Sequence, residues 1–373
     1  MNAARLALGR TTATTVEVED REVLSFAGCN YLGLAHHPNV LAALHAAIDE
    51  LGISAGASRQ TTGTNHEHEE LELELARFLR TESALLVADG YMANLATAQG
   101  LVSGGAPDVA NAIVDRECHV SIRDALAAVG LTPLEYAHAD ARAALQLVHG
   151  HKNESLALFT DGVFPSRGSI APLRELLAGL PAGASLVVDD CHATGVMGES
   201  GRGTCEHFGV ADPRVVITGT LSKALGCHGG FVAATTGVID AIRTHSRAYA
   251  GSTPIPPALA RAARASLAEL AGDPGRIERL RRNVARMRTH FTKMGLPVAK
   301  VSIPVFAFTL ASDAQMQRVE RALLAAGFLV PCVSYPDQPG RYLRLTLSSE
   351  HTVDDIDRLA AELGRAIRAP ASR

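Results

Sequence analysis

The stretch VVITGTLSKALGCHGG, residues 215–230, decides the fold and already points to chemistry. Its first residues are β-branched and aliphatic, which is typical of a buried strand, and a glycine-rich turn follows. Lys223 lies between the two, where an amine can be desolvated and made ready to form a Schiff base. The glycines and hydroxyl groups around it favour close approach of a phosphate-bearing cofactor. Taken alone, the stretch also fits a lysine in a surface loop.

Upstream, the stretch SLVVDDCHATGVMGESGRGT, residues 185–204, places Asp189 directly after a second apolar run and His192 three residues later. A carboxylate at a strand end can keep a pyridine nitrogen protonated, which is what a pyridoxal phosphate site requires. His192 can then bond to the phenolic oxygen of the ring. One alternative is that Asp189 and Asp190 cap a helix. A metal site is weaker, because no further His or Cys follows at useful spacing, and we expect no metal.

Similar short apolar runs recur along the chain between helical stretches, which predicts an α/β fold. Each ends in a polar or glycine-bearing turn: ALLVADG at 84–90, NAIVDREC at 111–118 and LALFTDGVF at 156–164. This alternation is typical of a mostly parallel, doubly wound sheet, whose ligands bind beyond the carboxyl ends of the strands. Polar residues gather at those predicted ends: Asp89, Gly90, Tyr91, Asp115, His119 and Asp161.

The pattern divides the chain into three expected parts: an N-terminal arm over 1–37, a large domain over 38–271 and a C-terminal domain over 272–373. The breaker GDPG at 272–275 opens the last part. A long basic helix, short strands and two further helices follow it, which predicts a small α+β domain. We expect continuous helix across the junction.

Composition excludes several classes of protein. The 373 residues are 47% hydrophobic and 20% charged, as in a globular chain, and no run approaches the roughly 18 apolar residues of a spanning helix. With a net charge of −4 and no Trp, we expect no nucleic-acid partner. Six scattered cysteines without a CxxC pair indicate reduced thiols, and the start lacks a secretory signal, so we expect a cytoplasmic protein.

The runs TGTLSKALGCHGG and VVDDCHATGVMGESGRG resemble the α-oxoamine synthases, fold-type I pyridoxal phosphate enzymes that condense an amino acid with an acyl thioester. The resemblance covers nearly the whole chain. Its further blocks, in family order, are CNYLGLAHHPNV, GASRQTTGTNHEHEELELELARFL, ADGYMANLA, DRECHVSIRDAL, TDGVFPSRGSIAPL, STPIPPALARAA and GRYLRLTLSSEHTVDDID. It implies a large cofactor-binding domain with a small C-terminal domain.

The resemblance implies catalytic roles for four residues, which also bind the cofactor. Lys223 matches the lysine that holds the cofactor covalently and later moves the α-proton, and Asp189 matches the partner of the pyridine nitrogen. His192 matches the partner of the phenolic oxygen. His119 matches the histidine that stacks on the cofactor ring; a helix-capping or core histidine is its alternative.

It also implies a phosphate site shared between two subunits. The backbone of Gly90 and Tyr91 meets the phosphate at a helix start, where the helix dipole is positive, and Thr220 adds a hydroxyl. Thr253 matches a residue that reaches the phosphate of the neighbouring subunit, which implies a homodimer. The alternative for Thr253 is that it caps, together with Ser252, the helix that begins at the following prolines.

For the substrates, Arg344 matches the arginine that grips the amino-acid carboxylate, a task suited to a two-pronged donor. Its alternative is a surface arginine on an edge strand. Where the family usually has Asn before YLGL, this chain has Gly28-Cys29-Asn30, so the substrate meets Cys29 or Asn30, and we assign Asn30 to substrate binding. Pro165 stands where a serine is usual.

The implied activity is that of an acyltransferase: decarboxylative Claisen condensation of a small amino acid with an acyl-CoA or acyl-carrier thioester, which gives an α-amino ketone. The run ASRQTTGT is similar to the 8-amino-7-oxononanoate synthases, which use alanine and a pimeloyl thioester. Glycine C-acetyltransferases, which make 2-amino-3-ketobutyrate, and long-chain or natural-product synthases are alternatives. More distant ones are a fold-type I aminotransferase or lyase and a non-catalytic subunit.

Overall fold

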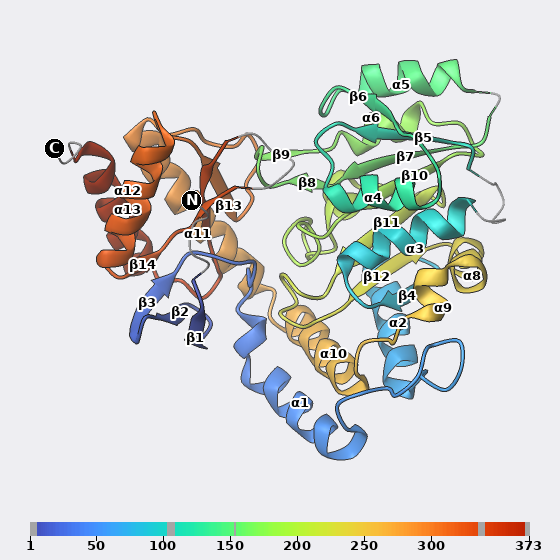
Figure 1. Cartoon of the computed structure of the whole chain (residues 1–373), viewed down its shortest axis with the longest axis horizontal. Coiled ribbons are helices and arrows are strands. Elements are labelled where there is room, and N and C mark those ends of the chain that lie inside the picture. The colour runs from blue at the N-terminus through green and yellow to red at the C-terminus, as the bar shows by residue number, and fades with distance from the viewer. Residues whose placement is uncertain (1–5, 103–108, 153, 335–339, 370–373) are drawn as a thin grey trace. The chain divides into compact units, whose positions relative to one another are not determined.

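The computed structural model describes residues 6–102, 109–152, 154–334 and 340–369. The chain forms two compact units (Figure 1). The large unit comprises Pro38–Phe164 and Ser169–Asp273. The small unit comprises the chain up to His37, the short segment Pro165–Gly168 and the chain from Pro274 onward. The expected arm and the expected C-terminal domain therefore fall within one unit.

A seven-stranded sheet forms the centre of the large unit, in the order β4-β12-β11-β10-β7-β5-β6. Its strands are β4 (Ser83–Val87), β5 (Asn111–Asp115), β6 (Leu134–Tyr136), β7 (Leu156–Asp161), β10 (Ser185–Asp189), β11 (Val215–Thr220) and β12 (Gly230–Ala234). All neighbours from β11 to β6 pair in parallel, and only β12 runs antiparallel to both its neighbours. This confirms the predicted mostly parallel α/β sheet.

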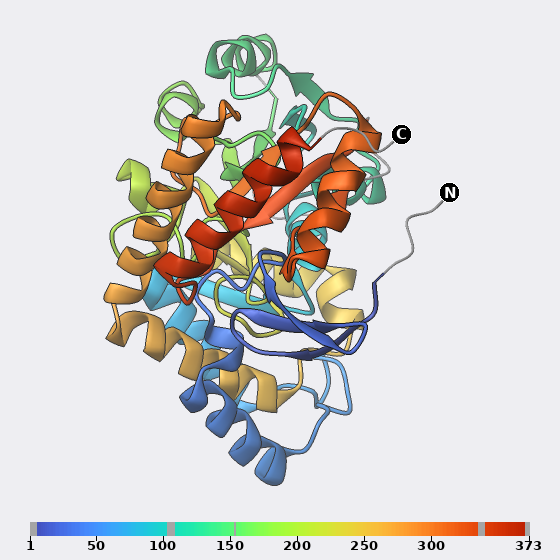
Figure 2. The same ribbon diagram turned by 90° about the vertical axis from the view of Figure 1, so that its left-hand side faces the viewer.

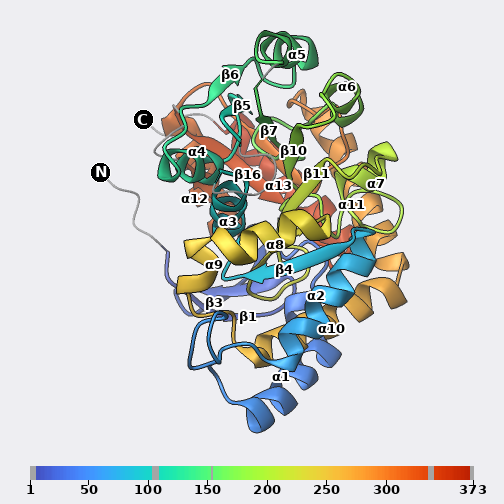
Figure 3. The same ribbon diagram turned by 90° about the vertical axis from the view of Figure 1, so that its right-hand side faces the viewer.

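The central strands are covered on both faces, which is why they read as unbroken apolar runs. Every residue of β7, β10, β11 and β12 is buried. The helices of this unit are α1 (Pro38–Leu51), α2 (His66–Leu79), α3 (Gly90–Val102), α4 (Val120–Ala128), α5 (Ala141–Gly150), α6 (Leu173–Ala178), α7 (Thr204–Phe208), α8 (Thr236–His245), α9 (Arg247–Gly251) and α10 (Pro257–Gly272). Helix α3 packs on β11 and β12 and lies between α4 and α8 (Figure 3).

Two short strands, β8 (Val163–Phe164) and β9 (Ser169–Ile170), form a hairpin beyond the end of β7. The four residues between them belong to the small unit. There Gly168 adopts a positive φ of 63°, and a Cβ on it would lie 2.5 Å from the Ala299 side chain. A glycine is therefore required at this turn.

In the small unit, the N-terminal segment and the C-terminal chain share a sheet. Strands β1 (Leu8–Thr11), β2 (Thr15–Val18) and β3 (Arg21–Ser25) pair antiparallel, and β14 (Phe328–Leu329) joins β3 in parallel. Figure 2 shows these blue strands beside the orange and red C-terminal elements. The sequence pattern did not predict β1 to β3, because the run is short, rich in Thr and Glu, and only half apolar.

A second sheet of this unit has the order β13-β16-β15, from β13 (Val305–Phe308), β16 (Tyr342–Thr346) and β15 (Cys332–Val333). Its helices are α11 (Gly275–Met294), α12 (Asp313–Ala325) and α13 (Val353–Arg368), and a 3-10 turn spans Leu34–His36. The side chain of Ser312 caps α12, and Thr352 with Asp355 forms a capping box at α13. These match the helices predicted from periodicity.

The expectation of continuous helix at the junction is wrong. Helix α10 ends at Gly272, and α11 begins at Gly275 after Pro274. Proline has no N–H for the helix ladder, and it disfavours helical backbone in the residue before it, Asp273. Among the described residues, no helix combines the length and apolar character that crossing a membrane requires.

Gly219 on β11 shows how closely the antiparallel strand β12 packs against β11. Gly219 is paired with Phe231, whose ring is fully buried, and a Cβ on Gly219 would lie 2.1 Å from the ring. We expect Gly219→Ala to lower the free energy of unfolding by about 1–3 kcal/mol, because the ring has no room to move. Urea denaturation measures this loss.

Gly237→Ala is the matched control, since Gly237 lies in the first turn of α8 with open space around its Cβ position. It should be neutral or stabilising by up to ~1 kcal/mol, as alanine is the better helix former. Equal unfolding midpoints for both variants would contradict the close packing of β12 on β11.

Candidate active site

The carboxyl ends of three neighbouring parallel strands bring polar side chains to one edge of the large sheet. Asp161 ends β7, Asp189 ends β10 and Thr220 ends β11. Asp161 and Asp189 are directly paired in register. All three side chains are buried. The structure thus brings together at one edge residues that the sequence spreads over 60 positions.

Two buried carboxylates side by side do not both carry a charge easily. Burial, and next the charge of Asp189, raise the pKa of Asp161 well above its usual range. The backbone N–H of His119, 3.2 Å from Asp161 Oδ1, and the charge of Lys223 act in the opposite direction. Asp161 therefore holds a proton more readily than an exposed aspartate does.

Asp189 is held by two donors. Its Oδ1 accepts the N–H of Cys191 at 3.0 Å, and its Oδ2 accepts the side-chain N–H of Asn94 at 2.7 Å. It does not cap a helix. The capping function belongs to Asp190, whose carboxylate accepts both the N–H of Thr204, at the start of α7, and its hydroxyl. Burial raises the pKa of Asp190 to about 7.

His119 is the N-cap of α4 and is exposed at this edge of the sheet. Its Nδ1 is 2.7 Å from Ser121 Oγ and also accepts the Ser121 N–H. His119 therefore does cap α4, as the alternative stated. The cap uses only Nδ1, and the side chain remains exposed. His192 lies half-buried in the turn after β10.

The start of α3 forms a close-fitting cradle. A Cβ on Gly90 would lie 3.0 Å from Cys191 Sγ and 3.1 Å from Thr220 Cβ, so only a glycine lets these two residues pack this closely against the helix start. The Asp89 carboxylate takes the N–H of Met92. The N–H groups of Gly90 and Tyr91 precede it in the first turn, where an α-helix supplies no acceptor of its own.

Tyr91 contributes its backbone rather than its ring to this cradle, because the phenol is exposed and donates to Asp124 on α4. On the opposite wall, the Thr220 hydroxyl donates to Gly229 O at 3.0 Å and lies 2.8 Å from Ser222 Oγ. Lys223 follows in the bend after β11, half-buried. Its ammonium is near enough to lower the pKa of Asp161 and of Cys191 against the larger effect of burial.

Thr253 is exposed in the loop between α9 and α10. The capping alternative does not hold, since α10 has Pro256 at its N-cap without a side-chain bond, and Ser252 bonds back to Ala248 O at 2.6 Å. Buried Ile255 anchors the loop, and its carbonyl oxygen is 2.7 Å from His68 Nε2.

The predicted substrate residues lie in the small unit. Arg344 is half-buried on β16, the central strand of its sheet, so the edge-strand alternative is wrong. Its Nη2 is 3.4 Å from Cys29 Sγ. Burial and then Cys29 raise the pKa of the Tyr31 hydroxyl, which Arg344 opposes. Asn30 is turned to its own loop, where Oδ1 accepts the N–H of Ala35 at 3.3 Å. Cys29, not Asn30, contacts Arg344.

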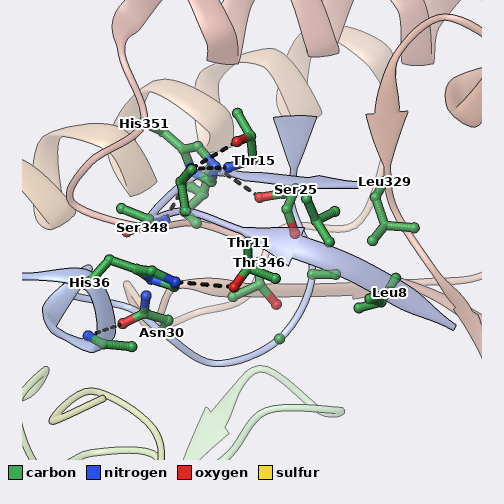
Figure 4. A pocket seen from close by; sticks show the side chains of 17 residues that line it. Leu8, Thr11, Thr15, Ser25, Asn30, His36, Leu329, Thr346, Ser348 and His351 are labelled. Atoms are coloured by element: carbon green, nitrogen blue, oxygen red, sulfur yellow. Dashed lines mark hydrogen bonds between the residues drawn. The ribbon is translucent and has the colours of Figure 1, made fainter. Parts of the chain in front are cut away.

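Beside this cluster, the small unit has a cavity of about 220 Å³ (Figure 4). Asn30, His36, Thr346 and His351 are among its lining residues. His36 Nε2 lies 3.1 Å from Thr11 Oγ1, and burial lowers the pKa of His351 to about 4, so that ring is neutral. The described lining residues include no Lys, Arg, Asp or Glu, which separates this cavity from the charged cluster at Arg344.

Sequence reasoning missed Asn94 and Ser121, which link His119 to Asp189, and it did not assign Asp161 a role. Asn94 and Ser121 stand in blocks that carry the family resemblance, yet helix periodicity gives a buried polar residue no signal. Only contact across α3, α4 and β10 reveals them.

The mostly parallel sheet and the matches to the family model and to solved structures show a pyridoxal phosphate-dependent enzyme of fold type I. The chain belongs to the aminotransferase class I and II family, whose model matches residues 21–363, and within it to the α-oxoamine synthases. The predicted family, fold and cofactor are thereby confirmed.

The chain is 39% identical over 370 residues to the 8-amino-7-oxononanoate synthase of Thioalkalivibrio sulfidiphilus, covering 98% of this chain and 93% of that relative. It is 39% identical over 358 residues to that of Methylococcus capsulatus, with 95% and 92% covered. Among solved structures, Sphingomonas wittichii serine palmitoyltransferase has a TM-score of 0.90 at 27% identity, with 98% and 92% covered. The 8-amino-7-oxononanoate synthase of Francisella tularensis has a TM-score of 0.79 at 27% identity, with 93% and 98% covered.

Proposed function

We propose that this enzyme condenses alanine with a pimeloyl thioester, with loss of carbon dioxide and a free thiol, to give 8-amino-7-oxononanoate. The observation that carries the proposal is the joint presence of Lys223, Asp189 and the Gly90 cradle at one sheet edge in a chain 39% identical to enzymes of that name. The cradle fits a phosphate, since it offers first-turn N–H groups at the positive end of α3, which the Thr220 hydroxyl joins if it turns away from Gly229 O.

When bound, pyridoxal phosphate supplies an electron-accepting ring that stabilises negative charge at the α-carbon of the amino acid. Gly90, Tyr91 and Thr220 would hold its phosphate, and His119 would pack on the ring. Asp189 would keep a proton on the ring nitrogen, because a carboxylate in buried surroundings favours a cation beside it. His192 would bond to the ring oxygen.

Lys223 has two tasks in this proposal. It would attach the cofactor, and its amine would later remove the α-proton of the bound amino acid. The α-carbon would then attack the thioester carbonyl carbon, the C–S bond would break, and the thiolate would leave and take a proton from solvent. The original carboxylate departs as carbon dioxide, and Lys223 returns its proton to the carbon. The raised pKa of Asp161 reduces the negative charge that it would add beside Asp189.

Arg344 would bind the amino-acid carboxylate until decarboxylation. Its position on a central strand gives the guanidinium a fixed backbone, and the thiol of Cys29 contacts one nitrogen while imposing little charge. A two-pronged hydrogen-bonded ion pair is the suitable contact for a carboxylate that must stay aligned.

A second candidate is a long-chain synthase that uses serine. It is favoured by the TM-score of 0.90 with serine palmitoyltransferase, against 0.79 with the synthase from Francisella tularensis, at the same 27% identity. Full-length identity of 39% with the 8-amino-7-oxononanoate synthases supports the first candidate more strongly.

We also propose a homodimer that works in the cytoplasm. All six cysteines are free, as in a reducing compartment. The exposed hydroxyl of Thr253, on a loop held by prolines and by buried Ile255, is suited to serve the phosphate of a neighbouring subunit.

The function is tested by measuring carbon dioxide and free thiol released from alanine with pimeloyl-CoA, beside serine with palmitoyl-CoA and glycine with acetyl-CoA. We expect turnover with the first pair. Lys223→Ala should abolish it, together with the borohydride-reducible link to pyridoxal phosphate, while Lys293→Ala, at an exposed position of α11, should change neither. Reduced cofactor mapped to another lysine, or preference for another pair, would overturn the proposal.

The contact between Arg344 and the amino-acid carboxylate is tested with Arg344→Lys, which keeps the positive charge but loses the two-pronged guanidinium donor. Affinity for alanine, followed by the absorbance change of the loaded enzyme, should fall by ~1–3 kcal/mol, or roughly 5- to 150-fold. Arg341→Lys, just before the same strand and half-buried, is the control and should leave the affinity unchanged. If the affinity is the same in both variants, another group binds the carboxylate.

The shared site is tested by mixing two inactive chains, Lys223→Ala and Thr253→Ala. Mixed dimers should recover activity, since one of their two sites then carries both intact residues. Thr253→Ala alone should bind pyridoxal phosphate more weakly in equilibrium dialysis. Mixed dimers no more active than the separate variants, with cofactor affinity intact in Thr253→Ala, would show the loop to be structural.

A further inference from the structure

Asn94 is buried in the large unit, with 1% of its surface exposed, on α3 one turn beyond Gly90. Its amide nitrogen donates to Asp189 Oδ2 at 2.7 Å and to Ser121 Oγ at 2.8 Å, and its oxygen accepts the hydroxyl of Thr218 at 2.8 Å. Both of its N–H groups are thus used. Four elements, α3, α4, β10 and β11, meet at this one side chain.

The contact with Asp189 determines how the amide is turned. An ionised carboxylate only accepts hydrogen bonds, so the NH₂ group of Asn94 must face Asp189 and the oxygen must face Thr218. An aspartate at position 94 would lose both donors and place a third carboxylate beside Asp189 and Asp161. A leucine of similar size would remove the Asn94 bonds to Asp189, Ser121 and Thr218, which are all buried, and would take from Thr218 the acceptor of its hydroxyl.

Asn94 also makes the surroundings of the two paired carboxylates different. Asp189 receives N–H groups from Asn94 and Cys191, whereas the described donor to Asp161 is the longer His119 N–H bond at 3.2 Å. Donors stabilise the ionised form of the acid they face. Asp189 thus has the stronger set of donors, while burial raises the pKa of Asp161.

A second series of hydrogen bonds, the His119 branch, runs from Asn94 through Ser121 to His119. Since Ser121 Oγ accepts from Asn94, its own hydrogen is available to His119 Nδ1, 2.7 Å away. The Ser121 N–H points to the same nitrogen at 3.3 Å. Nδ1 is therefore an acceptor, and the neutral ring carries its proton on Nε2. The orientation and the tautomer of His119 both follow from the same buried amide.

We propose that Asn94 is a positioning residue for the reaction: it holds the Asp189 carboxylate and, through Ser121, the His119 ring in one hydrogen-bonded unit tied to the phosphate cradle by α3. The inference rests on the proposed function, in which Asp189 contacts the nitrogen of the pyridine ring and His119 packs on the face of that ring. It adds that their alignment is set by a side chain that touches neither substrate nor cofactor.

The test uses holoenzyme loaded with ¹⁵N-labelled pyridoxal phosphate, whose ring-nitrogen chemical shift reports protonation. In Asn94→Ala the signal should move toward that of unprotonated pyridine. The value of kcat should fall roughly 10- to 100-fold, the loss of one charge-assisted hydrogen bond, with KM for alanine within about threefold. Thr218→Val removes only the hydroxyl that holds the amide and should give a smaller change in the same direction.

Ser121→Ala should leave the ring-nitrogen signal in place and alter the visible circular dichroism of the bound cofactor, because only the His119 branch is cut. If Asn94→Ala does not fold, as judged by far-ultraviolet circular dichroism, Thr218→Val and Ser121→Ala decide the question. A folded Asn94→Ala enzyme, or a Thr218→Val enzyme, with unchanged signal and kcat would overturn the proposal.

Asp189→Asn separates this proposal from the function on which it rests. If its ring-nitrogen signal moves while that of Asn94→Ala does not, the role of Asp189 stands and the inference about Asn94 fails. If Asp189→Asn leaves the signal unchanged, Asp189 is not the partner of the ring nitrogen, and the proposed function fails first.

Discussion

The carboxylate of Asp189 is buried, so its oxygens depend on hydrogen-bond donors supplied by the rest of the large unit. A buried charge costs several kcal/mol unless donors surround it. Two donors do so here, the N–H of Cys191 on the turn after β10 and the amide of Asn94 on α3. Since these come from different elements, the charge is stable only when strand and helix are both in place.

Strand geometry explains how the neighbouring aspartates 189 and 190 serve different purposes. Successive side chains along a strand point to opposite faces, so Asp190 turns away from Asn94 and toward Thr204. Its carboxylate fits because two glycines leave room: a Cβ on Gly162 would lie 2.1 Å from Asp190 Oδ1, and one on Gly203 would lie 1.8 Å from Oδ2. Asp190 thus anchors the glycine-rich loop after β10, and Asp189 is left for the cofactor.

In the small unit, the surroundings of Arg344 suit the binding of a carboxylate. Its strand is central, and its guanidinium contacts the thiol of Cys29. A neighbouring carboxylate would compete with an amino-acid substrate for the same N–H groups, whereas a thiol is a weak acceptor. The departure at Cys29 from the usual family residue is therefore compatible with a carboxylate-binding arginine.

Sequence alone determined the alternating strands and helices of the large sheet, the helices α11 to α13, and the residues at strand ends, because these depend on periodicity and on single-residue chemistry that are local in the chain. It also supplied the family, since whole blocks such as TGTLSKALGCHGG carry that signal. The sequence pattern did not predict the N-terminal strands or β12, because their runs are short and part of their pairing, β3 with β14 and β12 with β4, is with strands distant in the chain. Tertiary structure alone decided that Asp161 faces Asp189, that Asn94 joins Asp189 to Ser121, and that Cys29 rather than Asn30 meets Arg344. Each of these is a contact between side chains tens to hundreds of residues apart, and its energy depends on burial and donor geometry that exist only once the strands are aligned.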